Sequence, residues 1–206
     1  MRARPALTRR HRLAHPRTGR PSRGQALVEF ALVFPLFVIL LLGIIEFAFL
    51  FNALLSVNYA ARDAALAAAE AGNGVGADCV ILDAVDRAVG APADENRITT
   101  VEIYQATANG VLINTPTTYT RGGTTSGAAC GATGLSVPYT KTADGYTEAN
   151  RCNVLAGCGV GHATVDNVAV RITYVHRYVT PLQNFLGGGA TLSFDRSSVM
   201  RMEPIL

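Results

Sequence analysis

The sequence predicts an α+β protein in which a long N-terminal transmembrane and amphipathic helix packs on a small antiparallel sheet, with a disulfide-containing loop insertion. Three observations predict this fold class: an apolar stretch long enough to cross a bilayer, segments of alternating hydrophobicity toward the C-terminus, and four cysteines that all follow the apolar stretch. The chain of 206 residues is long enough for one domain with an appendage, and with 49% hydrophobic residues it is too apolar for wholesale disorder.

The first segment, residues 1–24, is strongly basic. It holds eight arginines and no acidic residue, which leaves 10 basic and 15 acidic side chains in residues 25–206. The formal charge of +3 therefore divides into +8 for the first segment and −5 for the rest. A basic run beside an apolar stretch is typical of a membrane topology signal, and an arm that binds nucleic acid is the alternative.

The apolar stretch comes next and predicts a membrane-spanning helix. Residues 30–45 contain no charge, and in residues 26–51 only Glu29 and Glu46 interrupt the stretch. A helix over residues 26–51 rises about 39 Å, more than the roughly 30 Å of a hydrocarbon core. The stretch is too long, and its end too bulky, for an ordinary cleaved secretory signal. Because the arginines precede it, the positive-inside rule keeps the N-terminus cytoplasmic and places residues 52–206 outside.

Hydrophobic periodicity and turn residues predict the elements that follow. The helix continues in amphipathic form to residue 71, with its turns marked by Leu54, Leu55, Tyr59, Arg62 and Leu66 and its end marked by Gly72-Asn73-Gly74. A second helix is expected over residues 77–89, and strands are expected over residues 97–106, 165–178 and 191–202. The remaining segments are predicted as a tight turn at Asn109-Gly110 before Val111-Leu112-Ile113, a Gly- and Thr-rich loop over residues 114–163, and a turn at Gly187–Gly189.

The residues between the basic segment and the apolar stretch form a junction of their own. Gly24 is followed by Gln25-Ala26-Leu27-Val28 and then by Glu29-Phe30. This junction resembles the type IV pilin superfamily and, within it, the TadE-like minor pilins of tight-adherence pili. The shared pattern is a basic leader that ends in glycine, followed by four residues, a glutamate, an aromatic residue and an apolar helix. Asn58–Ala65 also resembles the small-residue segment that ends the first helix of this family, and Val199–Glu203 resembles its closing strand.

The resemblance implies how the chain is processed. A membrane-embedded aspartic prepilin peptidase is expected to cut between Gly24 and Gln25, where the glycine leaves an extended, uncluttered backbone. Glu29, just before Phe30, is expected to pair with a new N-terminal amine, its own or a neighbour's, and so to set the register between subunits. Taken alone, Glu29 is also explained as an acid favoured by the helix dipole near the membrane surface. The amine of Gln25 can instead be lost by cyclisation.

The predicted organisation is a leader (1–24), a transmembrane and amphipathic helix (25–71) and an extracytoplasmic α+β domain (72–206). The resemblance implies a minor pilin or pseudopilin that takes part in assembly or initiation of a tight-adherence pilus or related secretion filament. It is expected in the bacterial cytoplasmic membrane, with the N-terminus inside and the C-terminal domain outside, or in an extracellular pilus. Its expected partners are the prepilin peptidase, other pilin subunits, the assembly machinery and the membrane, without nucleic acid, cofactor or small-molecule substrate.

Two alternatives stay open. One is an unprocessed single-span protein whose outer domain senses or binds a ligand, and the other is a membrane-anchored hydrolase that uses His162 or His176. Catalysis finds little support, so no enzyme is expected: neither histidine has a serine or cysteine nucleophile in a recognisable frame, and no phosphate-binding loop occurs. The acidic pairs Asp83/Asp86 and Asp144/Glu148 are expected to be solvated, as is Glu46 unless it contacts another subunit.

All four cysteines lie on the predicted outer side, where an oxidising compartment favours disulfides. Three connectivities are possible, and the short separation of Cys152 and Cys158 favours that pair together with Cys79–Cys130. A metal site built from Cys152, Cys158 and His162 matches no standard zinc spacing, so no metal is expected.

Overall fold

The structure is a computed structural model that describes residues 23–159, 161–181 and 189–204. Most of the predicted leader and part of the turn predicted at residues 187–189 lie outside the described residues. The chain divides into two compact units, Met1–Leu40 and Leu41–Leu206.

Both units contribute to α1, the helix Arg23–Ala71. In the first unit its apolar side chains are almost all exposed. The helix ends at Gly72, which has a φ of +62° and donates its N–H to the carbonyl oxygen of Ala68 at 3.3 Å. A glycine in the left-handed conformation is a common helix stop, and the predicted end of the helix at residue 71 is confirmed.

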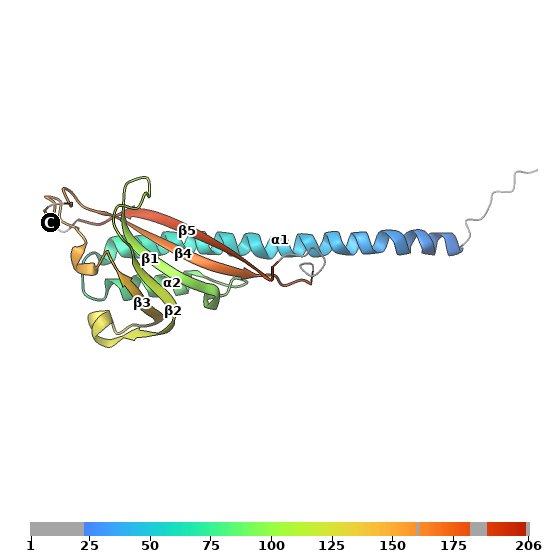
Figure 1. Cartoon of the computed structure of the whole chain (residues 1–206), viewed down its shortest axis with the longest axis horizontal. Helices are drawn as coiled ribbons and strands as arrows, with labels where there is room; N and C mark the ends of the chain where they lie inside the picture. Colours follow the sequence, from blue (N-terminus) through green and yellow to red (C-terminus); the bar gives the residue numbers. More distant parts are fainter. Residues whose placement is uncertain (1–22, 160, 182–188, 205–206) are drawn as a thin grey trace, which may run out of the picture. The chain divides into compact units, whose positions relative to one another are not determined.

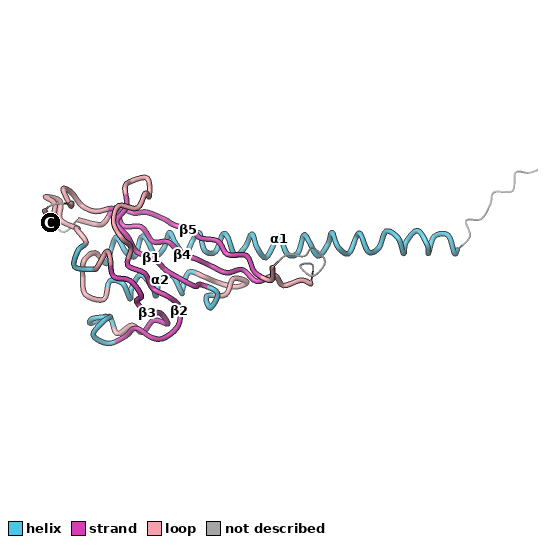
Figure 2. The backbone as a smooth tube through the Cα atoms, in the orientation of Figure 1, coloured by secondary structure: helices cyan, strands magenta, loops and turns pink. Residues whose placement is uncertain are grey.

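The second unit contains a five-stranded antiparallel sheet with the strand order β3-β2-β1-β4-β5 (Figure 1). The strands are β1 (Ile98–Ala106), β2 (Thr117–Ser126), β3 (Ser136–Asp144), β4 (Asn167–Arg177) and β5 (Thr191–Arg201). A second helix, α2 (Ala77–Ala88), lies between α1 and β1 in the chain, and the short 3-10 helices are η1 (Glu95–Arg97), η2 (Gly127–Thr133) and η3 (Glu148–Asn150) (Figure 2). The long helix and the antiparallel sheet confirm the predicted α+β class.

In the second unit α1 packs on the sheet through small residues. The buried apolar side chains of this helix are Ala53, Val57, Ala60, Ala61, Ala64, Ala65, Ala68 and Ala69. They belong to one core with buried residues of α2 and with the inward sides of β1 and β4, which are Val101, Ile103, Val168, Val170, Ile172 and Tyr174. These are the faces predicted for the two strands. Because alanine has a short side chain, the helix backbone can lie close to the sheet.

The large residues that mark the turns of α1 in the sequence face away from this core. Leu55, Tyr59 and Leu66 are 41%, 61% and 46% exposed. The sequence pattern placed the helix correctly, but the side that packs on the sheet is the alanine side.

Residues 114–163 contain β2 and β3, so their prediction as a loop is wrong. Thr117 and Tyr119 on β2 and Val137 and Tyr139 on β3 are buried, which means that alternate residues of each strand face the core. Threonine and tyrosine favour strands as β-branched and aromatic residues, but the many glycines of this segment obscure the alternation in the sequence.

Candidate functional site

The first described turn of α1 contains the junction that resembles a pilin processing site. Gly24 and Gln25 are helical, not extended, and a Cβ added at Gly24 would meet nothing within 4 Å. Gln25 donates its side-chain amide to Oε1 of Glu29 at 3.1 Å, one helical turn further on. Glu29 and Phe30 are both exposed, and Phe30 lies 5.2 Å from the ring of Phe34, centroid to centroid. The junction therefore presents an accessible backbone and a carboxylate that still has capacity for another donor.

The apolar part of α1 presents its side chains outward. Exposed large hydrophobic residues follow one another around the helix: Leu27, Val28, Phe30, Leu32, Val33, Phe34, Leu36, Phe37, Ile39, Leu40, Leu41, Ile44 and Ile45. By length and composition α1 can cross a membrane, and none of its most apolar stretch is buried inside the described structure. A helix that is apolar all round and lacks a protein cover is typical of a membrane span.

Glu46, near the C-terminal end of the apolar stretch, is buried and hydrogen-bonded, not solvated as predicted. Its side chain accepts the backbone N–H of Val179 at 3.0 Å and that of Thr180 at 2.7 Å, and Nε2 of His176 lies 3.3 Å from Oε1. Glu46 is only 6% exposed. We call these four residues the Glu46 clamp, because the carboxylate of α1 holds the end of β4 to the helix. Buried carboxylates are costly unless they are paired in this way.

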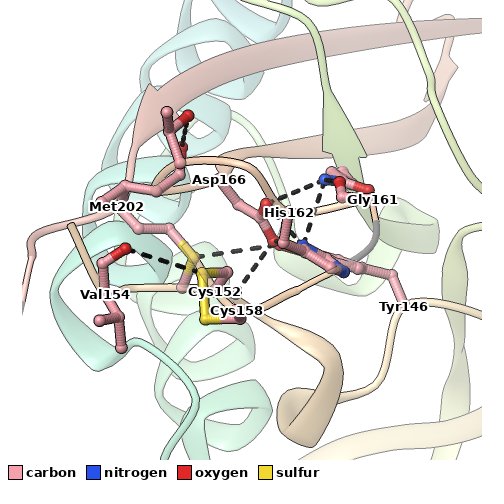
Figure 3. The surroundings of a disulfide bond; sticks show 11 residues. Tyr146, Cys152, Val154, Cys158, Gly161, His162, Asp166 and Met202 are labelled. Carbon is pink, nitrogen blue, oxygen red and sulfur yellow. Dashed lines mark hydrogen bonds and ion pairs between the residues drawn. A yellow bond between two sulfur atoms is a disulfide. The ribbon is translucent and has the colours of Figure 1, made fainter. Parts of the chain in front are cut away.

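Both cysteine pairs favoured by the sequence lie at disulfide distance. Cys79–Cys130 joins α2 to η2, and Cys152–Cys158 closes a short loop before β4. Figure 3 shows the second bond beside Asp166 and His162.

Asp166 is the centre of a buried polar network that fixes this loop. It accepts hydrogen bonds from the N–H of Cys152 at 3.0 Å and from the hydroxyl of Tyr146 at 2.8 Å (Figure 3). The side-chain amide of Gln105 also donates to it, at 2.9 Å. Nδ1 of His162 lies 2.8 Å from the same carboxylate. His162 is thereby engaged in holding the loop against β1.

A second buried network surrounds the N-terminus of α2. Arg151 is fully buried and forms an ion pair with Asp78, whose other oxygen accepts the Tyr119 hydroxyl at 2.6 Å. Burial and the neighbouring Asp78 carboxylate raise the pKa of Tyr119. Glu148, predicted as solvated, accepts the N–H groups of Gly76 at 3.2 Å and Asp78 at 2.8 Å, so it caps the helix. Free N–H groups at a helix N-terminus favour such a carboxylate.

The other predicted acidic residues divide into surface and buried roles. Asp83 pairs with Arg87 at 2.9 Å, and Asp144 with Lys141 at 3.1 Å, both on the surface. Asp86 differs from its prediction, because its carboxylate is only 21% exposed and accepts Arg121 at 2.7 Å and the Tyr139 hydroxyl at 2.6 Å.

The geometry gives the two histidines carboxylate partners. In the part of the chain that the structure describes, neither imidazole is hydrogen-bonded to a hydroxyl or thiol, and no group of three or more His, Cys, Asp or Glu side chains is arranged to hold a metal ion. The sulfurs of Cys152 and Cys158 are bonded to each other, which removes them as ligands of the metal site considered with His162.

Comparison with known proteins gives a family match. A search of curated proteins and a search of solved structures gave no match. Residues 24–66 match the model of the family described as TadE-like protein. The match begins at Gly24 and includes Gln25, Glu29 and Phe30, so it covers the junction that carries the predicted resemblance. This family and the apolar helix together indicate association with a membrane and with the Tad pilus. Over residues 24–66 the chain is thus similar to the TadE-like proteins.

Proposed function

We propose that the chain is a minor pilin or pseudopilin that takes part in the assembly or initiation of a tight-adherence pilus. The observation that carries this proposal is the TadE-like match over residues 24–66, which falls on the exposed apolar helix and its N-terminal junction. The role is structural: subunits associate through the helix, and no reaction is required of the outer domain.

The first step in this proposal is processing by a prepilin peptidase between Gly24 and Gln25. The peptide bond lies in the first turn of α1, where backbone N–H groups have no partner within the helix. Unwinding this turn for the peptidase therefore costs little. The eight arginines of the leader stay on the cytoplasmic face, and the two disulfides of the second unit support an outer location for it.

The second step is registration of the processed subunit through Glu29. Cleavage creates an amine on Gln25, one helical turn before Glu29, and the Gln25 amide is already a donor to this carboxylate. In an apolar filament core or membrane, Glu29 needs a donor from its own chain or from a neighbour. A carboxylate that must be paired fixes the axial position of one helix against another, even where the net stabilisation is small.

The test uses Glu29→Ala in a strain that lacks the native chain, with Glu70→Ala as the matched control. Glu70 is an exposed acid on the same helix, outside the apolar stretch. We expect Glu29→Ala to reach the membrane at the normal level but to be lost from sheared pili and from complexes with other pilins, whereas Glu70→Ala behaves as the native chain. Equal recovery of both variants in the pilus fraction would contradict the proposed role of Glu29. A native chain that never copurifies with pilins would instead favour an unprocessed single-span sensor.

A further inference from the structure

The Glu46 clamp buries the only charged side chain in the outer part of the apolar stretch. Between Phe30 and Phe51 the sequence contains no other charged residue. The carboxylate is 6% exposed, and two backbone N–H groups and an imidazole surround it. The surface that α1 presents beside Glu46 is therefore apolar, although the sequence has an acid there.

This burial lengthens the part of α1 that lipid can surround. The uncharged run of residues 30–45 has 16 residues, fewer than the ~20 that a membrane helix needs. With Glu46 withdrawn, the run extends to Phe51 and rises about 33 Å. Phe47 and Phe51 are 65% and 51% exposed, and their rings stack with centroids 6.1 Å apart.

The clamp also satisfies the backbone of the segment that it holds. Val179 and Thr180 follow the end of β4, and no strand pairing among the described residues includes them. Unpaired N–H groups are excluded from a membrane, so a segment at lipid depth needs an internal acceptor. Glu46 is that acceptor for both residues, while the side chain of Val179 is 61% exposed.

We propose that Phe47 and Val179 form an apolar rim that lies in the outer interface of the bilayer, with the Glu46 clamp seating the second unit on the lipid surface. This proposal rests on the membrane insertion included in the proposed function. Lipid is favoured as the partner because the rim continues the apolar stretch of α1 and because the carboxylate and N–H groups of the clamp are hydrogen-bonded to one another. A neighbouring subunit at the same place is an alternative that the test distinguishes.

The chain contains no tryptophan, so single substitutions supply unique fluorescent probes. Val179→Trp reports the rim. Val111→Trp is the matched control, because Val111 is also 61% exposed but follows β1, whose end at Ala106 pairs with Asn167 at the opposite end of β4. The two ends of β4, Asn167 and Arg177, are about 30 Å apart along the strand, so the two probes lie at opposite ends of the sheet. Phe37→Trp, in the apolar stretch, reports insertion itself.

The full chain is reconstituted in vesicles of phosphatidylcholine and phosphatidylglycerol, with the phosphatidylcholine brominated near the glycerol or near the methyl end of its acyl chains. We expect loss of fluorescence from Val179→Trp with bromine near the glycerol, and none from Val111→Trp, which aqueous acrylamide quenches instead. Adding Glu46→Ala to Val179→Trp should restore access to acrylamide, because the segment is released.

The outcomes separate the two proposals. If Phe37→Trp is quenched by bromine near the methyl end but Val179→Trp is not quenched by either lipid, the rim does not lie in the bilayer and this inference is overturned. Protection of Val179→Trp from acrylamide without quenching by lipid would also overturn it, in favour of a neighbouring subunit. Failure of Phe37→Trp to respond to lipid would overturn membrane insertion itself.

Discussion

Arg151→Met should destabilise the second unit more than any surface substitution. Arg151 is fully buried, and its partner Asp78 is 2% exposed. If one of the two charges is removed, water cannot reach the other to solvate it. Removal of one member of a buried ion pair costs about 3–5 kcal/mol, because the remaining charge is left uncompensated. The guanidinium also lies 5.5 Å above the ring of Tyr146, a contact worth about 0.5–2 kcal/mol.

The double variant Arg151→Met/Asp78→Ala separates the ion pair from the packing. Both charges are then absent. The remaining costs are the lost contact with the Tyr146 ring and the Tyr119 hydroxyl, which loses its acceptor at about 1–3 kcal/mol. The double variant should therefore lose less free energy of unfolding than the two single variants lose together, by at least about 2 kcal/mol.

The assay is urea unfolding of the full chain in detergent, followed by the near-ultraviolet circular dichroism of its tyrosines. Five of the seven tyrosines are buried in the second unit, so this signal reports the folding of that unit. The reasoning is refuted if Arg151→Met lowers the free energy of unfolding by less than about 1 kcal/mol, or if the two single losses add in the double variant.

Two other predictions concern the same domain. In urea unfolding, replacing Cys79 and Cys130 by alanine should lower the free energy of unfolding by about 4 kcal/mol, and replacing Cys152 and Cys158 should lower it by about 2 kcal/mol. The difference is expected because the two bonds close loops with separations of 51 and 6 residues. Equal losses would contradict this argument from loop length. Burial and neighbouring carboxylates raise the pKa of Tyr119, Tyr139 and Tyr146 above the ordinary value of 10. The contribution of these protonated hydroxyls to the stability of the fold is therefore fully present below pH 10 and is lost at higher pH. Ultraviolet titration should show these tyrosines ionising only as the domain unfolds; ionisation near pH 10 in the folded chain would count against their burial.

The sequence predicts the elements whose pattern is strong. Val168, Val170, Ile172 and Tyr174 alternate along one strand, and their buried face is found as predicted. The apolar stretch and the junction at Gly24 are likewise local features, visible without any knowledge of the fold. They are also the features that the family match covers.

What the sequence does not reveal depends on contacts between distant segments. Glu46 and Thr180 are 134 residues apart, and Arg151 and Asp78 are 73 apart. The burial of Glu46 had one local signal, because His176 continues the buried alternation of β4 beyond Tyr174. The strands within residues 114–163 were missed for another reason, since each has only two buried alternate residues, Thr117 and Tyr119 on β2 and Val137 and Tyr139 on β3, in a segment rich in glycine.

The central claim is that the chain is a processed pilin subunit, and its most direct test is mass spectrometry of the N-terminus after extraction from membranes. Cells with the prepilin peptidase should yield a chain that starts at Gln25, with or without loss of ammonia by cyclisation, and cells without the peptidase should retain Met1. Gly24→Ala is a suitable companion, because its added methyl group meets nothing in the helix and any change in cleavage then reflects recognition by the peptidase. An intact Met1 in cells that contain the active peptidase would contradict the claim.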